Sequence, residues 1–497
     1  MSGLKSLARD TAIYGLSSIV GRFLNYLLVP LYTAKMSVES GGYGVITNVY
    51  AMTALLLVIL TYGMETGFFR FVNRQDREPM VTYSTTLISV GVSSLAFIVL
   101  CLSFLRPISS VLGYGDHPEY IGMMAVVVAL DAFMSIPFAY LRYKKRPIKF
   151  AAVKMLFIIP NIALNLFFFV ACPWLSEHLP WAVDWFYDPG YGVGYAFVAN
   201  FICTSVQLLF LVPELRGFRY TFDRRLWREM MRYSMPILAL GVVGILNHTI
   251  DKIIFPHLFA DRAAAESQLG IYGAVSKVAM VMAMFTQAFR FAYEPFVFGK
   301  SRDKDSRATY ADAMKYFIIF GLLAFLAVAC YLDFLKFIIA PDYWEGLGVV
   351  PVVMASELFV GIFFNLSFWY KLIDETRWGA WFSLAGLVVV VTLNVVFVPR
   401  YGYVACAWAS LSGYVVITLL SYFVGQRKYP IRYDLRSICR YVLLAAVLYA
   451  VKVFAATGNL WIDAGVGTLL LAVFVVYVVR HDLPLRDIPI LNRLVRK

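Results

Sequence analysis

The chain has 497 residues, of which 61% are hydrophobic and 15% are charged, and its mean hydropathy is +0.71. A soluble protein averages about 45–50% apolar and about 25% charged residues, so the apolar excess is expected to face lipid. This composition excludes a chain built of soluble domains. The formal net charge of +13 suggests nucleic acid, but the placement of the basic residues, described below, argues against that partner.

Fourteen stretches are long and apolar enough to cross a bilayer, which requires about 20 residues for a hydrocarbon core of about 30 Å. The N-terminal residues lack the apolar core and cleavage site of a signal peptide, so we expect the first stretch to remain as a span. Only Pro399–Gly402 separates the eleventh stretch from the twelfth. The predicted helices are 11–33, 45–69, 82–105, 119–141, 147–171, 191–213, 235–258, 270–297, 314–340, 347–371, 379–399, 402–424, 438–456 and 463–480.

The basic residues predict the orientation of these helices. Of the 44 Lys and Arg, 33 lie in or beside the N-terminal segment and every second loop, five lie in the other loops and six lie inside spans. The segment Cys172–Gly192 has no Lys or Arg and is rich in Trp and Tyr, which is typical of an interfacial turn on the outer face. The pattern predicts a multi-pass protein with both termini in the cytoplasm.

Two stretches of the chain resemble each other: ESGGYGVITNV at Glu39–Val49 and ESQLGIYGAVSKV at Glu266–Val278. Other helices repeat at nearly the same offset, which a chance match would not do. The matching pairs are Tyr43 with Tyr272, Glu65 with Glu294 and Asn165 with Asn394 at an offset of 229, and Asn25 with Asp251 and Asp131 with Glu357 at an offset of 226.

This repeat predicts an all-α polytopic membrane protein with two pseudo-symmetric six-helix lobes and two appended C-terminal helices. Six is an even number, so both lobes keep one orientation, as in transporters that bind substrate between their halves. The predicted division is 1–213 for the N-terminal lobe, 214–234 for a cytoplasmic linker, 235–424 for the C-terminal lobe, and 425–497 for helices 13 and 14 and a cytoplasmic tail.

Ionisable residues inside spans cost about 2.5–3.5 kcal/mol each on insertion scales, and they usually face a bundle interior or a wet cavity. Asp251 and Lys277 are expected at one depth across a helical hairpin, where they would form an ion pair. The first lobe has the amides Asn25 and Asn48 at the equivalent positions. A structural role in holding each hairpin together is therefore one interpretation of these four residues.

Arg22 and Lys154 are harder to explain as structural residues. If both face a cavity between the lobes, with Lys252 or Arg290 opposite, they form a cationic patch suited to a phosphate-bearing headgroup. The alternative is that Arg22 pairs with Glu65 on the adjacent helix. Both interpretations stay open at the level of the sequence.

Motifs of catalysis are missing from the sequence. The stretch Phe298–Ser301 (FGKS) lacks the upstream glycine of a nucleotide-binding loop, and no H-E-x-x-H, G-x-S-x-G or metal-spaced His/Cys cluster occurs. The six cysteines contain no C-x-x-C pair, so we expect small buried hydrophobic residues. The protein is therefore expected not to be an enzyme and to use no cofactor or metal.

Several stretches resemble a known family. They are SIVGRFLNYLLVPLYT at 18–33, YG at 43–44, GMETGFFRF at 63–71, IDKIIF at 250–255, GIYGAVSKV at 270–278 and AYEPF at 292–296. Together they look like the first helical hairpins of the two lobes of Wzx-like polysaccharide flippases (O-antigen, capsule and exopolysaccharide), members of the multidrug/oligosaccharidyl-lipid/polysaccharide (MOP) exporter superfamily. The resemblance covers the first twelve spans.

The resemblance implies a flippase of a bacterial cytoplasmic (inner) membrane that moves polyprenyl-pyrophosphate-linked oligosaccharide for polysaccharide biosynthesis, by alternating access and coupled to an ion gradient. Arg290 and Glu294, one helical turn apart, can instead neutralise each other. The implied cationic substrate-binding residues are Arg22, Lys154, Lys252, Lys277 and Arg290. The implied ion-coupling residues are Asp251, Glu65 and Glu294, and the polar cavity or hairpin residues are Asn25, Asn48, Asn161 and Asn165.

Three alternatives stay open. A lipid II flippase similar to MurJ fits fourteen spans, and a MATE-like cation or drug antiporter fits the two lobes but not the basic cavity. A polytopic glycosyltransferase or O-antigen polymerase would need a large outer loop, whereas no outer loop exceeds about 20 residues. The expected partners are the lipid-linked oligosaccharide, membrane lipids and a glycan polymerase or export machinery. We expect no nucleic-acid partner, and we expect the transporter to be monomeric.

Overall fold

The structure is a computed structural model that describes residues 24, 26–74, 78–300 and 306–482. These residues form helices, turns and loops, and the described part of the chain contains no strand. Thirteen of its helical segments are long and apolar enough to cross a membrane. They confirm the predicted all-α polytopic class, while the first predicted span, 11–33, falls mostly outside the described residues.

The chain divides into two compact units, unit 1 (1–273) and unit 2 (274–497). The boundary lies inside a single long helix, α13 (Arg262–Lys300). Unit 1 therefore holds the first six predicted spans together with the seventh and the start of the eighth. The division into lobes at 213 and 235, which rests on the repeat, stays a prediction.

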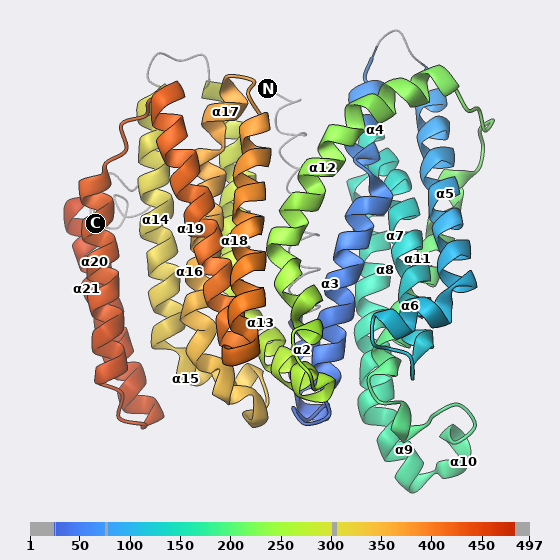
Figure 1. Cartoon of the computed structure of the whole chain (residues 1–497), viewed down its shortest axis with the longest axis horizontal. Coiled ribbons are helices and arrows are strands. Elements are labelled where there is room, and N and C mark those ends of the chain that lie inside the picture. Colours follow the sequence, from blue (N-terminus) through green and yellow to red (C-terminus); the bar gives the residue numbers. More distant parts are fainter. Residues whose placement is uncertain (1–23, 25, 75–77, 301–305, 483–497) are drawn as a thin grey trace, which may run out of the picture. The chain divides into compact units, whose positions relative to one another are not determined.

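In unit 1, α7 is the most extensively buried span, and it contacts α3, α5, α8 and α11 (Figure 1). α12 packs along α3 and also contacts α4 and α5. The helices of this unit are α2 (Leu28–Lys35), α3 (Gly42–Thr61), α4 (Met64–Val72), α5 (Pro79–Ser103), α6 (Leu105–Val111), α7 (Pro118–Tyr143), α8 (Pro147–Leu166), η1 (Phe167–Ala171), α9 (Cys172–His178), α10 (Pro180–Val183), η2 (Pro189–Tyr191), α11 (Gly194–Leu211), η3 (Val212–Leu215), α12 (Arg224–Ile254) and η4 (Phe255–His257).

Several helices begin where the sequence supplies a suitable first residue. Pro79, Pro118 and Pro147 open α5, α7 and α8, at a position where the missing N–H of proline costs no hydrogen bond. The Asp223 side chain accepts hydrogen bonds from the backbone N–H groups of Arg225 at 2.8 Å and Leu226 at 3.0 Å. It thereby caps α12, the longest helix that lies wholly in unit 1.

The segment predicted as an interfacial turn, Cys172–Gly192, is instead partly helical. α8 continues through the π-helical turn η1 into α9, and Pro180 starts the short α10. α9 ends at His178, because the next residue, Leu179, precedes Pro180 and is disfavoured in helical backbone. Trp181 and Trp185 are 80% and 81% exposed, as expected of aromatic anchors at a membrane interface.

The core of unit 1 beside α4 and α7 is aromatic. Tyr83 and Tyr140 stack with ring centroids 4.1 Å apart, and Phe68 packs edge-on against Tyr83. Phe68 and Tyr83 are fully buried. The Tyr83 hydroxyl donates to the backbone oxygen of Glu214 at 2.9 Å, so its burial leaves no unsatisfied polar group. These contacts hold α4, α5, α7 and η3 together.

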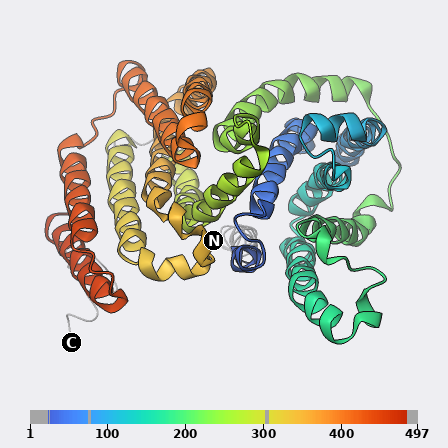
Figure 2. The ribbon, with the colours of Figure 1, turned by 60° about the horizontal axis from the view of Figure 1, so that its bottom comes forward.

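In unit 2, α16 and α18 both pack on α19, and α14 contacts α16 and the pair α20–α21. Figure 2 shows α20 and α21 beside α14. Gly402, at φ +57° and ψ −142°, separates α18 from α19, which confirms the predicted tight hairpin. The helices of unit 2 after α13 are α14 (Ser306–Cys330), α15 (Leu332–Leu335), η5 (Lys336–Ile338), η6 (Pro341–Val349), α16 (Val350–Leu366), α17 (Phe368–Leu372), α18 (Arg377–Tyr401), α19 (Tyr403–Lys428), α20 (Leu435–Phe454) and α21 (Leu460–His481).

Large apolar side chains cover the outward faces of these helices. Leu95 on α5 is 62% exposed, and Leu443 on α20 and Leu469 on α21 are 65% and 69% exposed. Water would not tolerate so many exposed apolar side chains on long helices, whereas lipid does. Five of the six cysteines are buried and Cys439 is exposed, so the expectation of buried cysteines is correct for all but one.

Candidate functional site

A break in the second predicted span positions Glu65. The sequence predicts one helix over 45–69, but Tyr62 (φ 31°) and Gly63 (φ +71°) adopt left-handed backbone and separate α3 from α4. A Cβ atom at Gly63 would lie 3.0 Å from the backbone oxygen of Ser234 on α12, so the break also allows a close helix contact. Glu65 consequently lies in the first turn of α4, where the helix dipole favours a carboxylate.

Glu65 forms an ion pair with Arg142, from the last turn of α7. The Arg142 Nη2 donates to the Glu65 Oε1, and the guanidinium lies 4.9 Å from the centre of the Phe69 ring. The two side chains are 41% and 33% exposed. The Arg142 Nε is buried and has no hydrogen-bond partner among the described residues. Arg142 therefore keeps a donor for a further acceptor.

Asp131 on α7 and Lys154 on α8 are a second pair of opposite charges next to the first. Their charges interact, and Lys154 also feels the charges of Glu65 and Arg142. The Lys154 Nζ lies 4.1 Å from the centre of the Phe138 ring, a cation–π contact that compensates part of its lost hydration. Both side chains are half-buried.

We call Glu65, Asp131, Arg142 and Lys154 the charge cluster. Asp131 and Arg142 are 11 residues apart, about three turns, so both lie on one face of α7. Pro137 interrupts the hydrogen-bond ladder between them.

The formal charges of the cluster sum to zero, which makes four ionisable groups tolerable within a bundle of spans. An entering phosphate would compete with the two carboxylates for the two cations, and a proton on either carboxylate would free the cation beside it.

The other predicted ionisable residues of unit 1 are held by local contacts. The Lys252 Nζ donates to Asp251 Oδ2 at 2.9 Å, and the Tyr272 hydroxyl donates to the same oxygen at 2.9 Å. Asp251 is 1% exposed. Lys277 belongs to unit 2, so the predicted Asp251–Lys277 pair stays a prediction. Arg22 lies outside the described residues.

Asn48 on α3 donates a hydrogen bond to a backbone carbonyl at the C-terminal end of α12. The fourth residue after Lys252 is Pro256, which has no N–H, so the Lys252 carbonyl lacks its usual helical donor. The Asn48 Nδ2 donates to this oxygen at 2.7 Å, and the Tyr114 hydroxyl donates to Asn48 Oδ1 at 2.8 Å. Asn48 is fully buried. Its contacts agree with the structural interpretation, although the expected partner, Asn25, lies outside the described residues.

Asn161 and Asn165 line one side of α8. The Asn165 Nδ2 donates to the Asn161 backbone oxygen at 2.7 Å, and its Oδ1 accepts from the Tyr32 hydroxyl at 2.7 Å. The repeat partner of Asn165 on α18, Asn394, donates in the same way to the Val390 backbone oxygen at 2.7 Å. These amides tie helices together, and neither predicted amide is hydrogen-bonded to the charge cluster.

The remaining predicted residues belong to unit 2. The Arg290 side chain is exposed, and its guanidinium lies 4.4 Å from the centre of the Phe364 ring. Glu294 lies on α13, but its side chain is outside the described part. The proposed neutralisation of Arg290 by Glu294 stays a prediction.

Sequence reasoning missed Arg142 as a site residue. The predicted fourth helix ends at residue 141 and leaves Arg142 among the orientation charges of a loop, whereas α7 continues to Tyr143. The available signal was the spacing of 11 residues from Asp131, which puts both charges on one helix face if the helix is extended by two residues.

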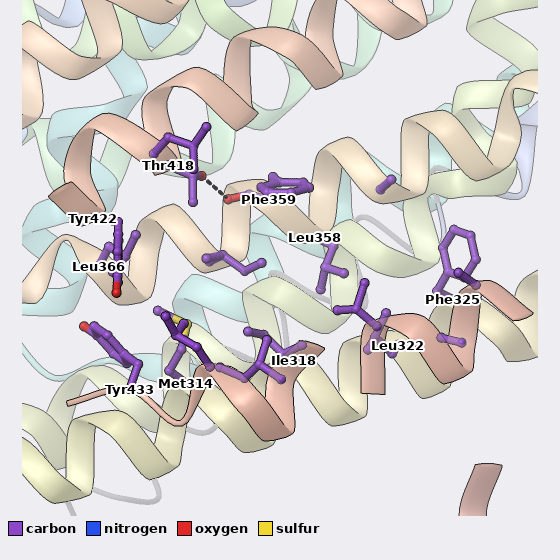
Figure 3. A pocket seen from close by; sticks show the side chains of 18 of the residues that line it. Met314, Ile318, Leu322, Phe325, Leu358, Phe359, Leu366, Thr418, Tyr422 and Tyr433 are labelled. Carbon is purple, nitrogen blue, oxygen red and sulfur yellow. Dashed lines mark hydrogen bonds between the residues drawn. The ribbon is translucent and has the colours of Figure 1, made fainter. Parts of the chain in front are cut away.

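Unit 2 carries an apolar groove of about 560 Å³ between α14, α16, α19 and α20 (Figure 3). Leu322, Phe325 and Leu358 line one part of it, and Tyr422 and Tyr433 line the other. The Thr418 hydroxyl, in this groove, is 3.5 Å from the backbone oxygen of Phe359. We call this feature the apolar groove. Its lining suits a hydrocarbon chain.

The fold is similar to that of solved membrane transporters. The lipid II flippase MurJ in an inward closed conformation superposes with a TM-score of 0.72 at 15% identity, covering 95% of this chain and 99% of that chain. An inward-facing multidrug resistance MATE family transporter of the MOP superfamily has a TM-score of 0.63 at 14% identity, covering 84% and 95%. The MATE multidrug transporter DinF-BH has a TM-score of 0.57 at 14% identity, covering 85% and 96%.

Sequence comparisons give a relative and a family. An uncharacterised membrane protein of Haemophilus influenzae is 21% identical over 353 residues, which is 68% of this chain and 75% of that protein. The family model for polysaccharide biosynthesis proteins matches residues 7–292, more than half of the chain. The predicted resemblance to polysaccharide-type proteins is thereby confirmed, and this chain belongs to the polysaccharide biosynthesis protein family.

Proposed function

We propose that the protein is a flippase that moves a polyprenyl-pyrophosphate-linked oligosaccharide from the cytoplasmic to the outer leaflet of a bacterial cytoplasmic membrane. The charge cluster carries this proposal, because it holds two cations among membrane-spanning helices: Arg142, paired with Glu65, and Lys154, whose charge interacts with that of Asp131. Membership of a polysaccharide biosynthesis family supports a glycan as cargo.

Arg142 and Lys154 are the proposed pyrophosphate ligands. The guanidinium offers a planar donor fork that matches phosphate oxygens, and the ammonium offers a compact charge. The unpartnered Arg142 Nε gives the headgroup a donor that Glu65 does not already use. Phe69 and Phe138, which lie against the two cations, keep the cations oriented when the carboxylates release them.

Glu65 and Asp131 are the proposed coupling groups. With both ionised, Arg142 and Lys154 are neutralised, and the headgroup must displace a carboxylate. With a proton on either carboxylate, one cation is free for the pyrophosphate. A proton gradient across the membrane would in this way bias binding and release on opposite sides during alternating access.

The test is flipping of a fluorescent undecaprenyl-pyrophosphate oligosaccharide in proteoliposomes. We expect Arg142→Gln and Lys154→Gln each to lower the initial rate at least about tenfold, the size of a lost charge-assisted hydrogen bond. Arg146→Gln and Lys144→Gln are matched controls, because both side chains are exposed just beyond α7, and they should flip at the wild-type rate. The proposal fails if neither cluster variant slows flipping.

The same vesicles separate the other candidate functions. Lipid II offered as cargo tests the activity named for MurJ, and a fluorescent organic cation tests the activity named for the MATE transporters. The double variant Glu65→Gln/Asp131→Asn should still flip the lipid but lose its response to an imposed pH difference. If no lipid moves and the organic cation is taken up, the protein is a cation transporter and not a flippase.

A further inference from the structure

A second pocket, of about 530 Å³, lies where four segments of unit 1 converge. The segments are the α2–α3 connection, the α6–α7 connection, the residues between η2 and α11, and the first turn of α13. We call it the loop pocket. Its volume is within the range of about 300–1,000 Å³ that is typical of small-molecule sites. The predicted topology places all four segments on the outer face.

One wall of the loop pocket is a stack of aromatic rings. His117 lies parallel to Tyr120, with centroids 4.8 Å apart and planes at 8°, and Tyr191 meets Tyr120 edge-on at 5.7 Å. Tyr120 is 4% exposed, whereas the His117 side chain is 50% exposed. The stack therefore presents the outer face of His117 as a flat surface for a ligand.

A guanidinium with a spare donor also lines the loop pocket. The Arg262 Nε donates to Glu266 Oε1 at 2.8 Å, and the guanidinium lies 4.6 Å from the centre of the Tyr114 ring. The Arg262 Nη2 is buried and has no hydrogen-bond partner among the described residues. A buried donor without a partner costs about 1–3 kcal/mol, so a ligand acceptor at this point would remove a real penalty.

A glycine keeps this guanidinium in place. Gly113 adopts φ +78°, and a Cβ there would lie 2.0 Å from Arg262 Nη1. Any larger residue at 113 would have to push Arg262 aside. On the aromatic side, the loop carrying Tyr191 is ordered by its own hydrogen bonds: the Gly190 N–H donates to Asp188 Oδ1 at 2.8 Å, and the Asp188 N–H donates to the Tyr195 hydroxyl at 2.6 Å.

The lining selects the chemistry of the ligand. Lys35 and Arg262 balance Asp116 and Glu266 in formal charge, which argues against a free anion. The described residues contain no group of three His, Cys, Asp or Glu side chains that could hold a metal ion. A hydrocarbon chain would leave these charges unsatisfied. Hydroxyl groups, which both donate and accept, suit a carboxylate facing a guanidinium, and the C–H face of a pyranose suits an aromatic plane.

We propose that the loop pocket is a carbohydrate subsite that binds one uncharged sugar ring, stacked on His117 and hydrogen-bonded by Arg262 and Glu266. That this sugar belongs to the transported glycan rests on the function proposed above. The subsite would hold the glycan on the receiving side after the headgroup has crossed, at a place separate from the charge cluster.

The test is binding of lipid-free oligosaccharides to the purified full-length protein in nanodiscs, screened on an array of bacterial glycans and then titrated with the bound glycans. His117→Ala removes the stacking surface, and we expect it to weaken binding about three- to tenfold. Gly113→Val displaces Arg262, and we expect it to weaken binding at least about tenfold.

Two variants provide matched controls. His178→Ala removes another exposed histidine that stacks on an aromatic ring, 4.6 Å from Trp174. Gly458→Val changes a glycine with the same φ of +78°, but no described atom lies within 4 Å of its Cβ position. Both controls should bind glycans as the wild type does. Unfolding temperatures of all four variants show whether a loss of binding reflects a loss of folding.

The result that overturns the proposal is a wild-type protein that binds no glycan on the array, or one whose binding is unchanged in His117→Ala and Gly113→Val. The outcome is distinct from that of the flipping assay. Flipping without glycan binding would keep the proposed function and reject the subsite, whereas glycan binding without flipping would keep the subsite and reject the proposed function.

Discussion

Gly44 on α3 lies directly against the backbone of Glu266 on α13: a Cβ atom at position 44 would be 1.9 Å from the Glu266 carbonyl oxygen. The repeat partner of Gly44 is Gly273, whose Cβ would be 2.2 Å from the Thr47 Oγ1. The repeated Tyr-Gly dipeptide therefore marks two places where α3 and α13 approach closely: backbone atoms block a side chain at Gly44, and only the Thr47 side chain blocks one at Gly273.

Gly44→Ala is consequently expected to destabilise the protein by about 1–3 kcal/mol, because a backbone atom blocks the new methyl group. Gly273→Ala should cost less, because the blocking atom is the tip of a side chain, and adding Thr47→Ala should recover the loss. Thermal unfolding in detergent measures all three. Gly465→Ala on α21, where no described atom lies within 4 Å of the Cβ position, should unfold at or slightly above the wild-type temperature. Equal unfolding temperatures for Gly44→Ala and Gly465→Ala would contradict the close approach.

Asn48 and Pro256 are expected to be coupled in stability. Asn48→Ala leaves the Lys252 carbonyl without a donor and should cost about 1–3 kcal/mol. In a Pro256→Ala background the backbone regains an N–H, so the same substitution should cost measurably less. A double-mutant cycle on the unfolding free energy gives the coupling. Asn73→Ala, which removes an exposed amide donating to the Phe69 carbonyl, is the control, and a cycle with no coupling would refute the capping role.

Asp482 should make the packing of the last helix sensitive to acid. Lys315 donates to Asp482 Oδ1 at 2.6 Å, and the Tyr441 hydroxyl donates to Oδ2. Burial works to raise the pKa of Asp482, but the hydrogen bonds from Lys315 and Tyr441 outweigh it and hold the pKa below the ordinary value of 3.8. The ionised form is therefore the stabilising one, fully present above about pH 4 and lost as pH falls through the folded-state value.

The measurement is the unfolding temperature of wild type and Asp482→Asn between pH 7 and pH 3. At pH 7 the variant should be less stable by about 2 kcal/mol, and the difference should shrink below about pH 4 as the wild type takes up the proton. Asp184→Asn, at an exposed carboxylate, should follow the wild type throughout. A difference that does not change with pH would contradict the role of the ionised carboxylate.

The apolar groove is expected to matter for the lipid part of the cargo, if the function proposed above is correct. Ala446 lines the groove and its side chain is exposed, so Ala446→Trp fills the groove without disturbing the core. Flipping of a long polyprenyl carrier should slow several-fold, and flipping of a short-chain analogue should not. Val447→Trp, on the next residue, which is 58% exposed, is the control. Equal rates for both tryptophan variants would remove the groove from the mechanism.

Sequence patterns predict the helices well, because apolar stretches long enough to span a membrane recur along the chain. Asn165 and Asn394, aligned by an offset of 229, are both fully buried and both donate to the carbonyl four residues earlier at 2.7 Å. The break at Gly63 was not predicted, since glycine is common in membrane helices and only the close approach to Ser234 makes it decisive.

Side-chain partners are harder to predict than helices. The Glu65–Arg142 pair depends on where α7 ends, and a two-residue error in a helix boundary is enough to turn a site residue into a loop charge. The loop pocket depends on four connections that are far apart in the sequence and share no pattern. Neither His117 nor Arg262 belongs to a recognisable motif in its own segment, and only the fold brings the two residues into one pocket.

The hydrogen bond from Asn48 to the end of α12 has a consequence for how the protein is assembled in the membrane. The donor lies in the first predicted lobe and the acceptor in the second, and Gly44 likewise packs against α13, so the lobe boundary predicted from the repeat is not a boundary of assembly. A nascent chain that has inserted only its first 213 residues still carries an unmatched amide and a bare glycine face within the membrane. The earliest state of unit 1 with these contacts complete arises when the start of α13 has emerged, and until then the growing chain depends on lipid or on the insertion machinery to shield them.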